Sequence, residues 1–358
     1  MAKFRKIGIL SSGGDAPGMN AVIRAVARKA IDEGVEVVGI LGGYSGLIKN
    51  RTIPLSPRAV SNIISRGGTI LYSDRCPEFK TEEGMQRAIE TCRANGIEAI
   101  VAIGGDGTFR GATDLTNHGI PTIGIPATID NDITATDYTI GFDSAMNTTM
   151  TMIDCLRDTC ESHARCNVVE VMGRDCGQLA LNTALASGAV AAVIPEIPFD
   201  EKELLERIAT LHGTGKRSFL VIVSEGGRTA DGKKYGEVLT EKIQAQTGIE
   251  SRFTRFGHVV RGGSPTMRDR YTATQMGVRA VQLLLEGKSN LVIVKTNGRI
   301  GELDINYALI ADRTYKGKLK QGDLDAFTPE QVSSMLALAE QRRGEIARAH
   351  EIVGVTSK

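Results

Sequence analysis

The sequence of 358 residues contains no tryptophan, and aromatic residues make up only 4% of it. Aromatic platforms that stack the bases of single-stranded nucleic acid are therefore not expected. The sequence also lacks an excess of charge of one sign, because it has 43 Lys and Arg residues and 42 Asp and Glu residues. Without a basic field we expect no nucleic-acid partner and no membrane partner, and any bound anion needs a local cluster of donors.

Long apolar runs and paired cysteine motifs are also missing. The apolar stretch near the start ends in Ser11-Ser12-Gly13-Gly14, far short of a secretory signal or a membrane span. The six cysteines have no C-x-x-C spacing, so reduced thiols are expected at Cys76, Cys92, Cys155, Cys160, Cys166 and Cys176. These features predict a cytoplasmic protein.

The chain has the composition of a globular protein, with 41% hydrophobic and 24% charged residues. Its length suits two lobes. Short β-branched runs alternate with segments of helical period, which is typical of an α/β fold with mostly parallel sheets. We predict strands at 6–10, 36–40, 99–103, 122–125, 167–172, 191–194, 219–224 and 291–295. Helices are predicted at 20–32, 81–94, 108–117, 144–162 and 329–351. The helix at 144–162 would join the two halves of the chain.

Glycine is abundant, with 41 residues, and it gathers in loops that follow predicted strands. Three such loops span 11–18, 104–108 and 126–132. The carboxyl ends of parallel strands meet at one edge of a sheet, so the three loops should form one site. Glycines let a backbone approach a phosphate, which the start of a helix then binds. Neither glycine-rich loop fits a P-loop or G-x-G-x-x-G, and a simple structural turn is the alternative for each.

Carboxylates in two of these loops point to phosphoryl transfer. Asp106 would repel polyphosphate unless Mg²⁺ bridges them, although it could instead be the N-cap of the next helix. Asp130 and Asp132 stand two residues apart, so an extended loop would put both on one side beside Thr128. An Asx turn is the alternative there. We expect Asp130 to act as general base toward an attacking hydroxyl.

Phosphoryl transfer also needs positive charge on the migrating group. Four candidates lie beside glycines or in predicted loops: Arg75, Arg174, His258 and Arg261. A single surface arginine is more often a solvated charge than a ligand, and this alternative stays open for each of them.

Six motifs extend this interpretation to a family. They are SGGDAPGMNAVIR (12–24), RGGT (66–69), GGDGT (104–108), TIDNDI (128–133), VVEVMGR (168–174) and GHVVRGGSP (257–265). In this order and spacing they resemble bacterial ATP-dependent 6-phosphofructokinases, from Lys6 to about Leu319. The resemblance implies two doubly wound α/β lobes with the active site in the cleft between them, usually in a homotetramer. It places an ATP-binding lobe at 1–140 plus about 259–309, and a sugar-phosphate lobe with a helical tail at 141–258 plus about 310–358.

The reaction implied is phosphorylation of the 1-hydroxyl of fructose 6-phosphate by ATP, with Mg²⁺, to give fructose 1,6-bisphosphate and ADP. The residues implied to hold ATP are Gly14, Arg75, Cys76, Gly105, Asp106, Gly107 and Thr108, with Asp106 on the metal. Those implied in catalysis are Thr128, Asp130, Asp132 and Arg174. The sugar phosphate would meet Thr128, Asp130, Met172, Gly173, Arg174, Glu225, His258 and Arg261, with Arg165 and Arg252 contributed by a neighbouring subunit.

Two positions bear on the phosphoryl donor. Gly107 leaves room for an α-phosphate, whereas pyrophosphate-using relatives have an aspartate there. Ala127 replaces the glycine of typical ATP enzymes and the lysine of pyrophosphate enzymes. ATP is the favoured donor; the alternatives are a pyrophosphate-dependent phosphofructokinase and, more remotely, an NAD kinase or a non-catalytic nucleotide sensor.

The resemblance also covers an allosteric cluster, which this sequence matches in part at Arg24, Arg28, Arg157, Lys216 and Arg217. Three positions differ, because Pro57 replaces an arginine, Asn62 an aspartate and Val190 a glutamate. Weak or altered effector control is therefore predicted. The stretch after about Gln321 is longer than in compact bacterial enzymes, and only helix packing or assembly is suggested for it.

Overall fold

The computed structural model describes residues 4–229 and 231–357, which form two compact units. Unit 1 comprises residues 1–129, 133–144 and 261–339, and unit 2 comprises 130–132, 145–260 and 340–358. The stretch 310–339, which the resemblance places in the second lobe, groups with unit 1 instead. One reason is that α10 (Ile305–Tyr315) packs against α4 (Asp106–Asn117) of that unit.

Unit 1 is built on a seven-stranded sheet in the described residues, in the order β11-β10-β5-β4-β1-β2-β3. The central pairs are parallel, and β3 and β11 join the two edges as antiparallel strands. The strands are β1 (Lys6–Ser11), β2 (Glu36–Ile40), β3 (Thr52–Pro54), β4 (Ala99–Gly104), β5 (Thr122–Pro126), β10 (Leu291–Thr296) and β11 (Arg299–Asp304).

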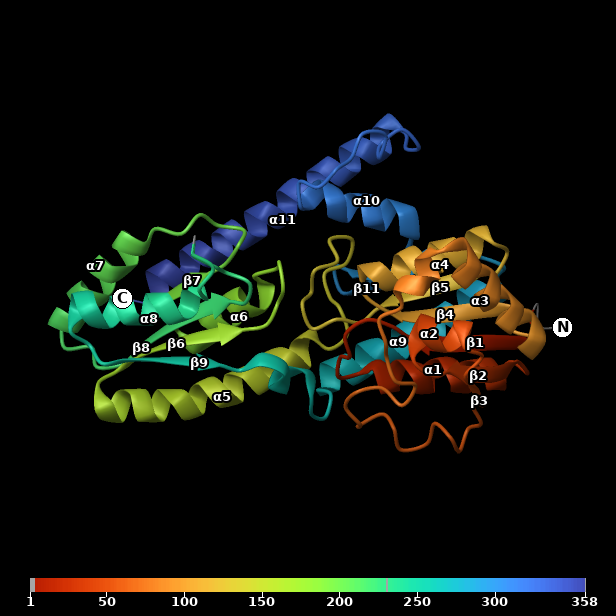
Figure 1. The fold of residues 1–358 in the computed structure, drawn as a ribbon, viewed down its shortest axis with the longest axis horizontal. Helices are drawn as coiled ribbons and strands as arrows, with labels where there is room; N and C mark the ends of the chain where they lie inside the picture. The colour runs from red at the N-terminus through yellow and green to blue at the C-terminus, as the bar shows by residue number, and fades with distance from the viewer. Residues whose placement is uncertain (1–3, 230, 358) are drawn as a thin grey trace. The chain divides into compact units, whose positions relative to one another are not determined.

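Helices cover both faces of this sheet (Figure 1). One core cluster combines residues of β1, β2, β4 and β10 with those of four helices, α2 (Gly43–Ile48), α3 (Glu82–Asn95), α4 and α10. On the other face α1 (Met19–Asp32) packs against α9 (Met267–Leu285). The contact is close, since a Cβ on Gly277 of α9 would lie 2.7 Å from the Cβ of Ala25. Unit 1 is therefore doubly wound.

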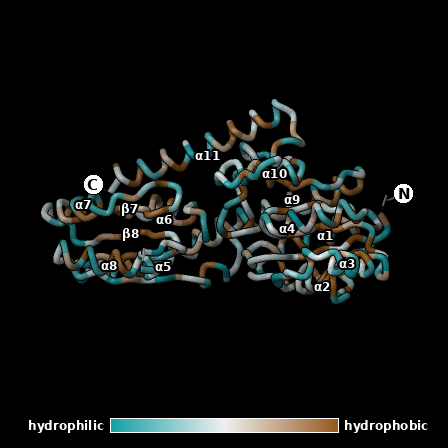
Figure 2. Tube along the Cα trace, turned by 45° about the horizontal axis from the view of Figure 1, so that its top comes forward, coloured by the Kyte–Doolittle hydropathy of each residue, from teal (hydrophilic) through white to brown (hydrophobic). Residues whose placement is uncertain are grey.

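Unit 2 has a parallel sheet of four strands in the described chain, in the order β7-β8-β6-β9. They are β6 (Cys166–Val171), β7 (Ala191–Val193), β8 (Phe219–Ser224) and β9 (Ser251–Arg255). Helices α7 (Glu201–Gly213) and α8 (Tyr235–Thr247) share a core with β6 and β8, and Figure 2 shows the hydrophobic run of β8 inside this unit. Helix α6 (Gln178–Ser187) packs against β7 and β8.

Two long helices pass from unit 1 into unit 2 along the chain. They are α5 (Phe142–His163) and α11 (Pro329–Thr356). In unit 2, α11 buries Ile346 and Val353, and the ring Nε2 of His350 lies 3.0 Å from the carbonyl oxygen of Ala192 in β7. The C-terminal helix thus lies against the β7 edge of that unit.

Every predicted strand and helix has a counterpart that ends within one or two residues of its predicted bounds, except α11, which continues to Thr356. Elements without a strong pattern were not predicted, such as the short β3 and the charged β9. The segment 226–234, between β8 and α8, has no helix or strand in its described part. Among the described residues, no helix has the length and hydropathy needed to cross a membrane.

Candidate active site

The loops after β1, β4 and β5 lie side by side along one edge of the unit 1 sheet, because these parallel strands are neighbours. The N–H of Ser12 donates to the carbonyl of Ile103 at 3.0 Å, and the N–H of Ala127 donates to the carbonyl of Gly104 at 3.0 Å. Thr108 Oγ1 also donates to the Ser12 carbonyl, at 3.1 Å. The predicted convergence of the three loops is confirmed.

The glycines of the GGDGT loop serve two different purposes. Gly104 has φ +159°, and a Cβ there would lie 2.3 Å from both the Ser12 carbonyl oxygen and Thr108 Oγ1. Packing within the protein therefore requires this glycine. At Gly105 and Gly107 a Cβ would meet no atom within 4 Å, and neither residue has a positive φ. The open space beside these two glycines fits a backbone that a phosphate approaches.

Asp106 is the first residue of α4, and Gly105 is the N-cap. The alternative that Asp106 is itself the N-cap is therefore wrong by one position. Its Oδ1 accepts from the N–H of Gly107 at 2.6 Å, and its Oδ2 lies 2.8 Å from Arg110 Nη2. The side chain remains 34% exposed. An anionic carboxylate here also meets the positive end of the helix dipole, which stabilises it.

The segment Ser73–Cys76 borders the first glycine loop. The Ser73 hydroxyl donates to the carbonyl of Gly13, next to the predicted ATP residue Gly14. Cys76 is partly buried against the unit 1 core, and this burial raises the pKa of its thiol. The side chain of Arg75 is exposed. Arg75 therefore lies two residues from a contact with the loop after β1.

The side chain of Arg261 contacts the same glycine loop. Its Nη1 donates to the carbonyl of Asp15 at 3.0 Å, and a Cβ on Gly14 would lie only 2.6 Å from that nitrogen. Glycine at position 14 is therefore needed for this contact. His258, three residues earlier in the short helix Gly257–Arg261, is exposed.

In unit 2 the predicted residues after β6 and β8 come together. Gly173 has φ +140°, and a Cβ there would lie 2.4 Å from the carbonyl oxygen of Cys176. Arg174 has φ +56°, and its N–H donates to Glu225 Oε1 at 2.9 Å. The N–H of Glu225 in turn donates to the Val171 carbonyl at 2.8 Å. The tight turn fixes the backbone of Arg174 beside the carboxylate of Glu225.

The TIDND segment is a turn, so the predicted extended loop is wrong. Asn131 has φ +50°, a left-handed conformation that asparagine tolerates well. Asp130 is 6% exposed and Asp132 is half-buried. Burial, followed by the charges of Glu196, Asp132 and Asp130, raises the pKa of the Cys176 thiol. Both aspartates therefore lie near the turn that carries Arg174.

The two arginines predicted to reach a neighbouring subunit share one carboxylate, which the sequence analysis missed. Arg165 Nε lies 2.9 Å from Glu250 Oε2, and Arg252 pairs with the same residue. The hydrogen bond from Arg165 is the main cause that lowers the pKa of Glu250. The short spacing of Glu250 and Arg252 was an available signal, because it puts an acid two residues before a predicted site arginine. Glu250 thus holds both cations together.

The predicted effector residues fall in both units. On unit 1, Arg28 Nη2 lies 3.5 Å from the carbonyl oxygen of Pro57, and burial with repulsion by Arg28 lowers the pKa of Arg24. On unit 2, Lys216 Nζ donates to the carbonyl of Ser357 at 2.7 Å. Burial and the charge of Arg157 lower the pKa of Lys216. Helix α11 therefore brings the end of the described chain onto part of this basic cluster.

The candidate residues divide by unit. Those expected to hold the nucleotide all belong to unit 1, together with Thr128 and Arg261. Those expected to hold the sugar phosphate otherwise belong to unit 2: Asp130, Asp132, Arg165, Met172, Gly173, Arg174, Glu225, Arg252 and His258. The expected nucleotide residues thus fall in one unit, and most of the expected sugar-phosphate residues fall in the other.

Glycine loops at the carboxyl ends of parallel strands, a helix N-terminus with an acid, and arginines paired with carboxylates define a phosphate-handling α/β protein of the phosphotransferase kind. The phosphofructokinase family profile matches residues 6–284. The chain belongs to the phosphofructokinase family.

Similar proteins agree with this assignment. The chain is 49% identical over 317 residues to ATP-dependent 6-phosphofructokinase 1 of Clostridium perfringens, covering 88% of this chain and 97% of that protein. It is 47% identical over 318 residues to ATP-dependent 6-phosphofructokinase of Bacillus velezensis, covering 89% and 98%. The phosphofructokinase structure of Pichia pastoris in the T-state matches with a TM-score of 0.86 and 33% identity, over 99% of this chain and 40% of that longer one.

Proposed function

We propose that the protein is an ATP-dependent 6-phosphofructokinase, which transfers a phosphoryl group from ATP to the 1-hydroxyl of fructose 6-phosphate. The observation that supports the proposal is that the glycine loops expected to hold ATP lie along one sheet edge of unit 1, while most of the residues expected to bind the sugar phosphate belong to unit 2. The similarity to bacterial relatives with this activity, over 88% of the chain, supports the same reaction.

Asp106 is the proposed magnesium ligand. The described residues contain no group of three or more His, Cys, Asp or Glu side chains that could hold a metal. Mg²⁺ commonly binds through one or two carboxylates plus phosphate oxygens, and a partly exposed carboxylate at a helix start fits that donor set. The metal would neutralise charge on the donor phosphates. The side chain of Arg110 would then exchange its carboxylate partner for phosphate oxygens.

Asp130 is the proposed general base and Arg174 the proposed stabiliser of the migrating phosphoryl group. Asp130 is buried in a turn whose geometry Asn131 fixes with its positive φ. A base held in this way needs little reorganisation when it takes the proton of the sugar hydroxyl. Asp132 and Thr128 flank it, and the Gly173 turn directs Arg174 toward the same region of unit 2.

His258 and Arg261 are proposed to bind the 6-phosphate of the sugar in their own subunit. Arg165 and Arg252 are proposed to complete the same site in a neighbouring subunit of a homotetramer. The ion pairs with Glu250 support this role, because they hold two guanidinium groups together at the surface of unit 2. A phosphate that bound both arginines would form charge-assisted hydrogen bonds, which are about twice as strong as neutral ones. The proposed location is the cytoplasm.

A coupled assay with fructose 6-phosphate tests the function, with ATP or pyrophosphate as donor and with or without Mg²⁺. We expect turnover with ATP and Mg²⁺ alone, because the space beside Gly107 can accept an α-phosphate. Turnover with pyrophosphate but not ATP would make the protein a pyrophosphate-dependent enzyme. An arm with NAD as acceptor tests an NAD kinase, and binding of ATP without turnover on any acceptor would favour a nucleotide sensor.

A further inference from the structure

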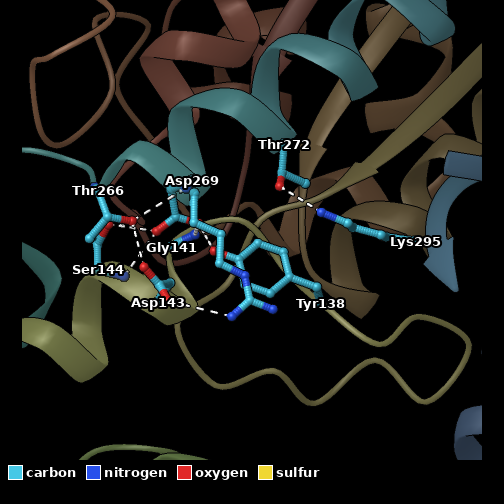
Figure 3. A network of polar contacts seen from close by, with 9 residues as sticks. Tyr138, Gly141, Asp143, Ser144, Thr266, Asp269, Thr272 and Lys295 are labelled. Carbon is cyan, nitrogen blue, oxygen red and sulfur yellow. Dashed lines mark hydrogen bonds and ion pairs between the residues drawn. The ribbon is translucent and has the colours of Figure 1, made fainter. Parts of the chain in front are cut away.

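Asp269, at the start of α9, is a fully buried carboxylate that none of the predicted roles uses. Its exposure is 0%, and both of its oxygens accept hydrogen bonds (Figure 3). Oδ1 accepts from the hydroxyl of Tyr138 and from the N–H of Gly141 at 2.8 Å. Oδ2 accepts from the N–H and the hydroxyl of Ser144 at 2.9 and 2.5 Å. Burial raises the pKa of Asp269, and these hydrogen bonds oppose the shift.

The donors to Asp269 all come from the segment 138–144, which lies far from α9 in the sequence. A buried carboxylate that is fully hydrogen-bonded fixes its partners strongly, because losing one partner leaves a charged group unsatisfied. Ser144 extends the network, since its hydroxyl oxygen accepts from the N–H of Thr266 at 2.9 Å. Arg268 lies over the ring of Tyr138, 4.5 Å from its centroid. The position of Tyr138–Ser144 is therefore determined by the first turn of α9.

The same segment holds the catalytic turn. Thr139 Oγ1 donates to the carbonyl of Thr128 at 2.7 Å, and the N–H of Ile140 donates to the carbonyl of Pro126 at 3.0 Å. Ala127 and Ile140 also form a bridge. The backbone that leads into Asp130 is thus bonded to a segment that Asp269 anchors.

The first glycine loop touches this segment as well. A Cβ on Gly18 would lie 2.6 Å from the side chain of Ile140, and a Cβ on Gly141 would lie 2.6 Å from Ala16. Only residues without side chains allow so close an approach. The segment 138–141 is therefore packed between the loop after β1 and the loop after β5. Asp269 fixes it through the hydrogen bonds from Tyr138 and Gly141.

We infer that Asp269 is a positioning residue for phosphoryl transfer, which acts through Tyr138, Gly141 and Thr139 to hold the Thr128–Asp130 turn in its reactive geometry. The inference rests on the proposed function for the role of that turn. Holding reacting groups in place is a large part of catalysis, and a displacement of about 1 Å can lower a rate about a hundredfold.

The test is steady-state kinetics of Asp269→Asn, measured at a temperature where circular dichroism shows it folded. The amide keeps the shape of the carboxylate, but its N–H₂ group replaces one of the two acceptor oxygens. The donors that bind that oxygen, either Tyr138 and Gly141 or the two groups of Ser144, therefore lose their acceptor. We expect kcat to fall roughly ten- to hundredfold while the KM for ATP changes little. Thr139→Val, which removes the donor to the Thr128 carbonyl, should lower kcat in the same way, and the two losses should not add because they break one path.

Leu284→Ala is the matched control. Leu284 lies in the same helix at 1% exposure but outside the network, so its truncation should lower the thermal midpoint while leaving kcat unchanged. The inference is wrong if folded Asp269→Asn keeps the wild-type kcat, or if Leu284→Ala loses as much kcat for an equal fall in thermal midpoint. An inactive wild-type protein would instead refute the proposed function.

Discussion

The N–H of Arg174 donates a hydrogen bond of 2.9 Å to the carboxylate of Glu225. Arg174 has φ +56°, a backbone conformation that non-glycine residues adopt rarely and at some cost in free energy. Glu225 is fixed in turn by its own N–H on the carbonyl of Val171. The two residues follow the neighbouring parallel strands β6 and β8. The register of these strands therefore determines how close the backbones of Arg174 and Glu225 lie.

Replacing Glu225 tests this arrangement. Glu225→Ala removes the acceptor, so the turn should relax and Arg174 should lose its fixed position. A hydrogen bond to a charged group contributes about 1.5–3 kcal/mol, which predicts a loss of roughly ten- to hundredfold in kcat/KM for fructose 6-phosphate. Glu225→Gln keeps an acceptor oxygen and should lose less. Equal losses in the two variants would show that the charge, not the hydrogen bond, matters.

Asp130→Asn should abolish most turnover without preventing binding. The amide cannot accept the hydroxyl proton, and general base catalysis typically contributes about 10²–10⁴-fold. Steady-state kinetics should show this fall in kcat, and calorimetric titration should show near-normal binding of ATP and fructose 6-phosphate. A variant that turns over at the wild-type rate would remove Asp130 from the role of base.

Two neighbouring glycines should respond differently to alanine. Gly104→Ala should lower the free energy of unfolding by about 1–3 kcal/mol, because its φ is +159° and the Cβ would collide with Ser12 and Thr108. Gly107→Ala, in the first turn of α4, should leave stability unchanged or raise it by up to about 1 kcal/mol. Its KM for ATP should nevertheless rise.

Thermal unfolding and ATP kinetics of both variants check this prediction. The pair separates the structural glycine from the one that leaves room for a ligand. A Gly107→Ala protein with unchanged ATP kinetics would contradict the proposed approach of a phosphate to this residue.

Glu250→Gln should change the acid sensitivity of the fold. The pKa of Glu250 is lowered in the folded state, so its contribution to stability is present above the ordinary glutamate pKa of about 4.3 and is lost as pH falls through the lower folded value. The variant should therefore show a smaller drop in thermal midpoint than the wild type between neutral pH and the acid range. Glu241→Gln, an exposed position on α8, is the control and should follow the wild type. Identical curves for Glu250→Gln and the wild type would mean that the ion pairs with Arg165 and Arg252 do not stabilise the fold.

The placement of the three loops was predictable from the sequence. Each loop follows a strand of a parallel sheet, and the carboxyl ends of such strands lie at the same edge. The conformation of the TIDND segment was not predictable. Alternating residues suggested an extended loop, but Asn131 adopts a left-handed φ, and a local choice of that kind leaves no periodic signal. The N-cap alternative also failed for a local reason. It took Asp106 as the N-cap, but Gly105 occupies that position, because glycine is also a favourable N-cap residue.

Two carboxylates escaped notice because their partners are distant in sequence. Glu250 meets Arg165 only through the pairing of β6 with β9, in which Cys166 is opposite Ser251. Asp269 resembles an ordinary acid in the first turn of a helix, which usually faces solvent. Its burial depends on residues 138–144, which reach it only in the folded chain.

The discontinuous make-up of unit 1 affects how the nascent chain acquires its structure. Strand β10, which pairs with β5, and helix α9, which covers one face, are synthesised only after the whole sheet of unit 2. At a ribosomal rate of about 5–20 residues per second, β5 waits on the order of 10 s or more for its neighbour. During that interval an apolar strand edge and the uncovered side of the early sheet are exposed, so the emerging polypeptide should depend on chaperones most heavily before residue 291 leaves the ribosome.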